Sequence, residues 1–478
     1  RSSDSRTVTM STNLPVNSVV SVIATDNVQD MSGNRLPDFI STFTTAAAND
    51  TGRPSVTTFY PGNSSTNVRP NASAVFYTNE ELDPATVDAA FHASVNGVLV
   101  DGTLNVIGNG HALEFIPQQD WPNSALVHVF LDSNARDLNG NALNSYQASF
   151  RTIADSATTG LSLVASSPVH GKRNVGVSTV IDLQFNEALD PTSVNDTTIG
   201  LKRLGAGTDV PVTLSLLKGN RVIRIAPDAA LDSDGVGNLY YYYYSRNGGV
   251  TDVDGNAQTF SRYFYTGASD AEDSVSPSLV SIAPPDGSTE VGITARIDMR
   301  FDEAMNPISF IEESIDDVVT RSLSFSSNNQ TVVQIPHTPF AANSEITFDL
   351  PAVEDPSGNV LNAASTTFTT ASGPDNQKPV IASYSPVANA MDVPVNSAVV
   401  VEFNEVIDPI TVNSGTIYVQ DTVNGWIKVA GTLSIATDKR TVTFVPDEAW
   451  AVGRRYYAYR AGVKDISGNT ISSHANYF

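Results

Sequence analysis

The side chains of this sequence that could do chemistry are mostly carboxylates. A glutamate recurs in the motif F-x-E-x-x-[DN]-P, as Glu187, Glu303 and Glu405, and as Glu80 in a copy where Thr78 replaces the phenylalanine. An aspartate recurs in the motif D-x-x-G-N, which occupies residues 30–34, 137–141, 252–256, 355–359 and 465–469. Paired carboxylates serve either as a general acid and base or as ligands of a hard cation such as Ca²⁺.

The repetition of these acids argues against catalysis. A catalytic acid–base pair needs one environment that separates the two pKa values, whereas here the same set returns in every copy. We therefore expect the four glutamates to hydrogen-bond the backbone of the neighbouring turn. The six histidines form no H-x-x-H pair, and the sequence has no G-x-S-x-G elbow, P-loop or dinucleotide fingerprint. The sequence predicts that the chain is not an enzyme.

Two acidic loops are candidate calcium sites. Asp252, Asp254 and Asn256 form one, Asp232 and Asp234 form the other, and both resemble the first half of a calcium-binding loop. Neither loop has the closing glutamate, so neither is an EF-hand. Asp-Gly pairs are also ordinary turn residues, and that alternative stays open. We expect no required cofactor, with Ca²⁺ as the ion that these loops could bind.

The linkers between repeats offer a second place for calcium. They contain Asp270, Glu272, Asp273 and Asp375, whose carboxylates could stiffen the junctions by binding the ion.

A different kind of surface is predicted at 240–244, a run of five tyrosines whose residue type favours a strand. Alternation would point about half of the rings outward, where they could bind glycans or a neighbouring subunit. The alternative is that the rings pack on one another across strands.

The residues around each motif predict the elements that carry it. Ahead of the glutamate, apolar residues alternate, as in Ile181, Leu183 and Phe185, which predicts a strand with one buried face. After it, an Asp-Pro pair suits the N-cap and first position of a single helical turn that carries the chain between sheets. The D-x-x-G-N motif predicts a type I turn with its glycine in the left-handed region, joined to a last strand.

Both motifs recur at intervals of about 100–115 residues, which predicts a tandem array. The predicted full repeats are residues 54–153, 159–267, 276–371 and 379–478, and residues 1–47 hold only the second half of a repeat. About seven short strands per repeat predict an all-β fold of immunoglobulin-like (Ig-like) β-sandwich domains. The short linkers predict that the domains lie end to end as an elongated rod.

The half-repeat has a consequence of its own. Alone, it would expose its core face and unpaired strand edges, so we expect missing sequence or another chain to complete it. We therefore expect the chain to be part of a longer protein.

At the paired motifs the sequence resembles the bacterial Ig-like tandem repeats of the S-layer and adhesin type, over nearly the whole chain. The resemblance implies seven-stranded sandwiches in secreted surface proteins such as S-layers, adhesins and filament subunits, and in spacer modules of some polysaccharide-degrading enzymes. It implies no catalytic residues. The departures are Thr78, Asn306 and a third repeat that lacks much of the middle of the sandwich.

Composition narrows the possible partners. The chain has 51 acidic and 27 basic residues, a net charge of −24, which argues against nucleic acid and against an anionic membrane surface. It has no cysteine, as is common in bacterial exoproteins and equally in cytosolic proteins. No apolar stretch reaches the roughly 18 residues that span a bilayer.

Together these features predict a structural or adhesive protein of the bacterial cell surface. Its repeats would form a stalk, surface-layer or filament segment, with neighbouring copies, other surface proteins or glycans as partners. The alternative is an accessory spacer or glycan-binding region of a secreted carbohydrate-active enzyme.

Overall fold

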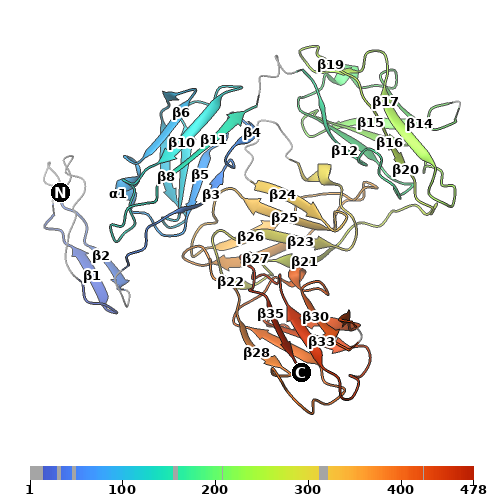
Figure 1. The fold of residues 1–478 in the computed structure, drawn as a ribbon. Helices are drawn as coiled ribbons and strands as arrows, with labels where there is room; N and C mark the ends of the chain where they lie inside the picture. Colours follow the sequence, from blue (N-terminus) through green and yellow to red (C-terminus); the bar gives the residue numbers. More distant parts are fainter. Residues whose placement is uncertain are drawn as a thin grey trace.

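Strands joined by turns and irregular loops make up nearly the whole of the computed structural model, which describes residues 14–28, 34–45, 50–153, 160–206, 208–311, 321–423 and 425–478. The described part contains four sandwiches, which we call the first to fourth repeats, and a hairpin before them (Figure 1). Within these residues no helix is long and apolar enough to cross a membrane. The all-β, tandem Ig-like fold expected from the sequence is confirmed.

Each repeat packs an opening sheet, which contains its first strand, against a closing sheet, which contains its last. The opening sheets have the same four-stranded order in all four repeats. They are β3 (Val56–Tyr60), β5 (Ala74–Thr78), β9 (Ala112–Pro117) and β8 (Gly102–Ile107); β12 (Leu163–Ser167), β13 (Ile181–Phe185), β16 (Val222–Pro227) and β15 (Val212–Leu217); β21 (Leu279–Ala283), β23 (Ile297–Phe301), β25 (Thr331–Pro336) and β24 (Arg321–Ser326); and β28 (Ile381–Ser385), β29 (Val399–Phe403), β33 (Thr441–Pro446) and β32 (Gly431–Ile435).

The closing sheets vary more in strand number. They are β4 (Ser65–Val68), β11 (Tyr146–Thr152), β10 (Leu126–Leu131), β6 (Phe91–Val95) and β7 (Val98–Leu99); β14 (Ile199–Arg203), β17 (Tyr240–Ser245) and β20 (Ser261–Tyr265); β22 (Ser288–Val291), β27 (Ser365–Thr370) and β26 (Glu345–Asp349); and β31 (Ile427–Lys428), β30 (Ile417–Asp421), β34 (Tyr456–Arg460) and β35 (His474–Tyr477). A short ribbon of β18 (Val250–Thr251) and β19 (Ala257–Gln258) completes the second repeat.

The core of each repeat lies between its two sheets. In the second repeat the predicted alternation is met, because Ile181, Leu183 and Phe185 point inward and are buried against Tyr243 and Phe264 of the closing sheet. The intervening Asp182, which alternation places on the outer face, is also only 1% exposed. It is buried because the third repeat covers that face, a contact that period-two reasoning on a single strand cannot foresee.

A single helical turn follows the second strand of every opening sheet, as the sequence predicted. These turns are α1 (Pro84–Val87), η1 (Pro191–Ser193), η2 (Pro307–Phe310) and η3 (Pro409–Thr411). Each has proline at its start and an N-cap whose side chain accepts a hydrogen bond from the backbone N–H two residues on. The N-caps are Asp83, Asp190, Asn306 and Asp408.

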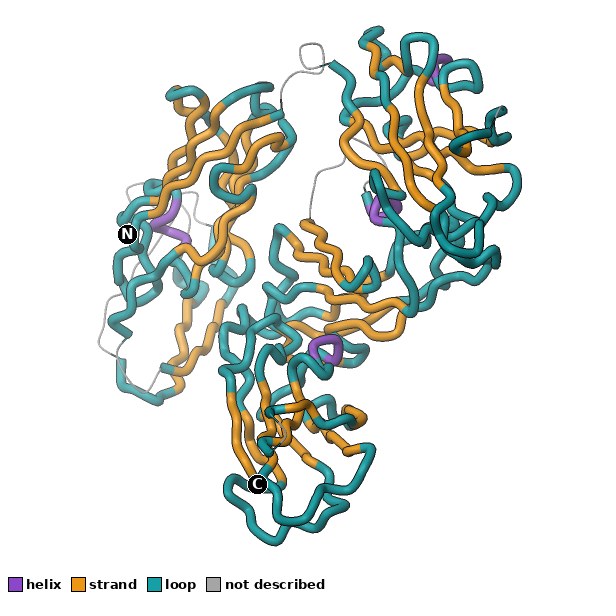
Figure 2. Tube along the Cα trace, turned by 45° about the vertical axis from the view of Figure 1, so that its right-hand side comes forward, coloured by secondary structure: helices purple, strands orange, loops and turns teal. Residues whose placement is uncertain are grey.

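The repeats are not strung in one row, which differs from the predicted rod. Figures 1 and 2 show the third repeat beside the first, the second and the fourth. The hydroxyl of Tyr77 donates to the carbonyl of His337 (2.8 Å), and the ring of Tyr60 stacks on the His337 ring at 4.6 Å. The rod was expected because short linkers favour end-to-end packing. The third repeat instead docks on the outer face of the second repeat's opening sheet, and the fourth docks on that of the third.

The hairpin of β1 (Val19–Ala24) and β2 (Phe39–Thr44) is the described part of the predicted half-repeat. Its apolar side chains lie open, with Ile23, Phe39 and Ile40 all more than half exposed. Among the residues that the structure describes, no second sheet faces this hairpin, so it buries no core of its own. The first D-x-x-G-N copy lies almost wholly outside the described residues.

Candidate metal centre

The D-x-x-G-N turn is built around its aspartate. In the third repeat, Oδ1 of Asp355 accepts from the backbone N–H groups of Ser357 (2.7 Å) and Asn359 (2.9 Å), and Oδ2 accepts from Nδ2 of Asn359 (2.8 Å). The same three bonds form in each of the other described copies. The glycines have φ between +85° and +97°, so the predicted left-handed position is confirmed.

The asparagine of this motif also holds the linker that precedes the repeat. Nδ2 of Asn359 donates to the backbone carbonyl of Asp273 (3.3 Å), and Nδ2 of Asn469 donates to that of Asp375 (2.9 Å). The motif therefore positions an acidic linker residue beside its own buried aspartate.

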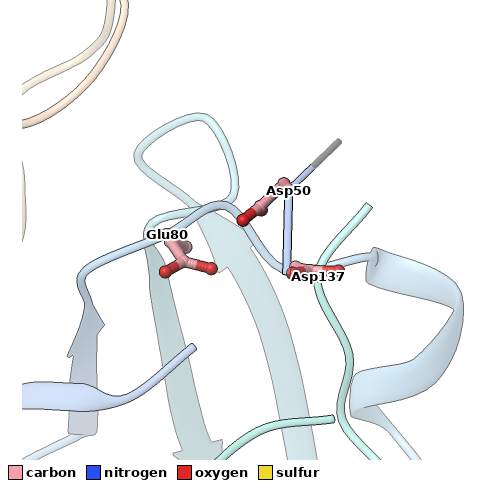
Figure 3. Close-up of side chains that lie close together, drawn as sticks. All are labelled: Asp50, Glu80 and Asp137. Carbon is pink, nitrogen blue, oxygen red and sulfur yellow. The ribbon is translucent and has the colours of Figure 1, made fainter. Parts of the chain in front are cut away.

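The recurrent glutamate completes a cluster of three carboxylates, which we call a triad. One ligand atom from each member lies within 4.8 Å of the others in three places: Asp50, Glu80 and Asp137; Asp273, Glu303 and Asp355; and Asp375, Glu405 and Asp465. Figure 3 shows the first triad, with the three side chains contributed by the linker, the end of β5 and the turn after β10. Each triad joins the entry of a repeat to its D-x-x-G-N turn.

Comparison with known proteins places the repeats in a family. The family described as bacterial Ig-like domain matches residues 50–152, 157–266, 273–370 and 375–478. The chain belongs to the bacterial Ig-like domain family. No curated protein matches the chain.

Among solved structures, the bacterial Ig-like chain is similar to the S-layer protein SbsC, with 9% identity over 89% of this chain and 54% of that one and a TM-score of 0.20. It thus spans about half of that S-layer structure. It is also similar to L,D-transpeptidase 1 of Mycobacterium tuberculosis, with 14% identity over 45% of this chain and 88% of that one and a TM-score of 0.16. A third is the Down Syndrome Cell Adhesion Molecule, with 9% identity over 93% and 56% of the two chains and a TM-score of 0.15.

The electrostatics of the triads in these bacterial Ig-like repeats follow from their crowding. Burial, together with the neighbouring Asp273 and Asp355 carboxylates, raises the pKa of Glu303 to about 7. Burial and the carboxylates of Asp465 and Asp375 raise the pKa of Glu405 to about 7 as well. Like charges at this distance disfavour ionisation, and a bound cation would relieve that repulsion.

The glutamates do not all make the backbone hydrogen bonds that the sequence predicted. Glu80 accepts from the side-chain Nδ2 of Asn79 (3.1 Å), and its Oε2 is buried without a hydrogen-bond partner among the described residues. The reason lies in the turn, where the N–H groups of Asn139 and Asn141 already donate to the Asp137 carboxylate. Glu80 therefore faces a carboxylate where we expected a donor.

The donor set fits a hard cation. Each triad supplies up to six carboxylate oxygens, and Ca²⁺ takes six to eight oxygen ligands. Asp273 and Asp375 were named from the sequence as linker acids, whereas the recurrent glutamates were assigned to backbone contacts. The sequence did contain a sign that these residues belong together. The linker aspartate stands 30 residues ahead of the glutamate in all three triads.

The second bacterial Ig-like repeat breaks this pattern. The residue 30 positions ahead of Glu187 is Ala157, which carries no carboxylate. This repeat contains all five residues chosen from the sequence as calcium candidates, and none of them belongs to a described acidic cluster. Calcium binding at these five positions stays a prediction.

Hydrogen bonds and an ion pair engage those five residues. Asp252 accepts from the N–H groups of Asp254 and Asn256, Asp234 accepts from three N–H groups of its own loop, and Asp232 pairs with Arg203 (2.8 Å).

Proposed function

We propose that the chain is a structural segment of a bacterial cell-surface protein, in which the Ig-like repeats set the spacing and arrangement of what they connect. The observation that carries this proposal is the direct docking between repeats. Ile466, in the D-x-x-G-N turn of the fourth repeat, packs into the core cluster of the third and is only 8% exposed. Because a core residue of the third repeat comes from the fourth, the two repeats are held in a fixed arrangement.

The second and third repeats support the same reading. The backbone N–H of Val180 and the hydroxyl of Thr179 both donate to the carbonyl of Pro356, at 2.9 and 3.0 Å. Pro356 holds the same motif position as Ile466. Bacterial Ig-like domains are typically non-catalytic, and the clustered acids of this chain recur as the same structural set in three of the four repeats.

The experiment that tests a surface structural role is localisation on intact cells. Antibodies against the purified chain should label the outside of unpermeabilised cells, and external protease should remove that label. Electron microscopy of the labelled envelopes should place the signal on a layer, a fibre or a stalk. Label that appears only after permeabilisation would overturn the proposal.

We also propose that Ca²⁺ binds the triads, with affinity in the range of about 10⁻⁴–10⁻³ M that is usual for extracellular modules. Calorimetric titration of CaCl₂ into the EDTA-treated full chain should give saturable binding. Glu303→Gln should remove one site, while Glu187→Gln, in the repeat that has Ala157 at the place of the triad's linker aspartate, should leave the stoichiometry unchanged. No saturable heat at millimolar calcium would contradict this second proposal.

The alternative role, a glycan-binding or spacer region of a secreted enzyme, is favoured by one surface of the second repeat. Five half-buried tyrosines lie next to one another on β17 and β20: Tyr240, Tyr242, Tyr244, Tyr263 and Tyr265. The guanidinium of Arg173 lies 4.0 Å from the centre of the Tyr265 ring. Aromatic faces of this kind can stack on sugar rings.

Affinity electrophoresis in gels that contain cell-wall polysaccharides tests this alternative. Binding should retard the chain, and Tyr242→Ala should reduce the retardation while Leu138→Ala, on the first repeat, should not. Equal migration of all three proteins in every gel would leave the structural role as the one supported.

A further inference from the structure

Two junctions of this chain are built on the same pair of positions. On the outer face of the opening sheet, β13 carries Asp182 and β23 carries Asp298 at equivalent places in the strands Ile-Asp-Leu-Gln-Phe and Ile-Asp-Met-Arg-Phe. Each meets the N-cap of the helical turn in the following repeat, which is Asn306 at the first of these junctions and Asp408 at the second. All four residues are buried, with at most 3% of each exposed.

At the junction of the second and third repeats both oxygens of the buried Asp182 carboxylate have hydrogen-bond donors. Nδ2 of Asn306 donates to Oδ2 of Asp182 at 2.7 Å. The guanidinium of Arg224 donates to both oxygens of Asp182, at 2.8 Å each, and also to Oε2 of Glu354. The buried carboxylate of Asp182 is thus held by a bidentate arginine and a neutral amide, which is a satisfied arrangement.

At the junction of the third and fourth repeats the amide is replaced by a carboxyl group. Oδ1 of Asp408 accepts from the N–H of Ile410 (2.9 Å), as Oδ1 of Asn306 does from Ile308. β23 packs against the helical turn η3, which brings the carboxyl group of Asp408 to that of Asp298. Oδ1 of Asp298 is buried and is offered no N–H donor by the described residues. A carboxyl group can donate a hydrogen bond only when it holds a proton.

We propose that the junction between the third and fourth repeats is a proton-binding site. One proton shared by Asp298 and Asp408 supplies the hydrogen bond that the amide of Asn306 supplies at the preceding junction. With the proton in place, Asp408 donates to Asp298 and the repeats dock. Without it, two buried carboxylates repel each other across the interface and the junction loosens.

The surroundings agree with this assignment. The charged group that faces the pair is Arg296, which lies just before β23 and pairs with Oδ2 of Asp298. Arg300, also on β23, borders the neighbouring cleft with Val412 and Asn413. From the fourth repeat, Lys464 contributes its backbone carbonyl, which accepts from the N–H of Asp408. One guanidinium therefore faces two carboxylates, and burial together with Asp298 raises the pKa of Asp408 above its usual range.

The direction of the pH effect follows from linkage. The docked junction binds the proton more tightly than separated repeats do, so docking is favoured at low pH. It weakens as pH rises from the ordinary range of an aspartate through the raised pKa of Asp408, by up to about tenfold in the docking constant per pH unit for one proton. The preceding junction, which has asparagine at this place, has no such proton to lose.

The absence of cysteine makes a direct distance measurement possible. Cysteines introduced at exposed Glu345 of the third repeat and Val452 of the fourth carry spin labels, in the full chain. The distance distribution should be narrow near pH 6 and broaden near pH 9 in the otherwise unchanged protein. Asp408→Asn keeps the N-cap and restores an amide donor, so its distribution should stay narrow at both pH values.

The reciprocal change guards against a variant that merely disturbs folding. Asn306→Asp, with labels at Val236 and Glu345, should make the preceding junction broaden at high pH when it did not before. Circular dichroism at both pH values checks that each variant keeps its strands. Broadening of the same size in Asp408→Asn as in the parent, or no broadening in the parent, would overturn the proposal.

Discussion

At the scale of single residues, many of the carboxylates of this chain lie in close clusters. Three triads and the Asp298–Asp408 pair each hold carboxylates close together in a protein that already has a net charge of −24. Such contacts cost stability unless a cation or a proton enters, because like charges at short range disfavour ionisation. The carboxylates therefore make the repeats responsive to the ions around them.

The first prediction concerns Glu303, whose pKa is raised to about 7. A raised pKa means that Glu303 contributes most to the stability of the folded, calcium-free protein below the ordinary pKa of glutamate, and that this contribution is lost as pH rises through about 7. Glu303→Gln should remove that loss. Above pH 7 the substitution should raise the free energy of unfolding by no more than about 1 kcal/mol, because water screens this partly exposed group.

Thermal unfolding in EDTA at a mildly acidic and a mildly alkaline pH measures this difference. Glu187→Gln is the matched control, since the second repeat has Ala157 where the other triads have aspartate. A Glu303→Gln protein that still loses as much stability with rising pH as the parent would contradict the assignment.

At the scale of elements, the D-x-x-G-N turn is both a turn and a docking tip. Its second residue is buried against the preceding repeat in the fourth repeat, as Ile466, and exposed in the first and second, as Leu138 and Val253, at 61% and 73%. The same turn geometry thus places this residue in an interface in one repeat and in solvent in two others. What differs is whether a neighbour's opening sheet lies against it.

The second prediction follows from that contrast. Ile466→Ala empties a place in the core of the third repeat, so it should lower the free energy of unfolding by about 2–4 kcal/mol. Leu138→Ala removes an exposed side chain from the equivalent turn and should change it by no more than about 0.5 kcal/mol. Chemical denaturation of the full chain, followed by tryptophan fluorescence, measures both, and equal effects would show that Ile466 does not join the two repeats.

Local structure was predictable from the sequence because it depends on local chemistry. The alternation of Ile181, Leu183 and Phe185, the Asp190-Pro191 start of a helical turn and the left-handed glycine each follow from one short stretch of residues. The burial of Asp182 and the grouping of Asp273, Glu303 and Asp355 do not. They join positions 30 or more residues apart, and such contacts depend on which faces the folded repeats bring together.

At the scale of the whole molecule, the arrangement of repeats departs from the expected rod. The sequence indicated short linkers, and short linkers restrict distance without fixing direction. The direction is set by Pro356 and Ile466, which dock on the side of the preceding sandwich. With the third repeat docked on the side of the second, Tyr77 of the first repeat reaches His337 of the third.

The third prediction tests this contact between the first and third repeats. Changing both Tyr60 and His337 to alanine removes the stacked rings at the contact, so the radius of gyration in small-angle X-ray scattering should increase. His128→Ala, on a strand of the first repeat, serves as the control and should leave the scattering unchanged. An unaltered curve for the double variant would show that other contacts set the shape.

The contact at His337 also decides how the chain carries tension. A pull on the two ends passes from the first repeat to the third through their contact, which includes Tyr77, His337 and the packing of Gly108 against Pro339, so the second repeat carries no tension. When that contact breaks, the second repeat enters the loaded path and the chain lengthens without any domain unfolding. The contact between the first and third repeats therefore keeps about one domain's length of the chain in reserve.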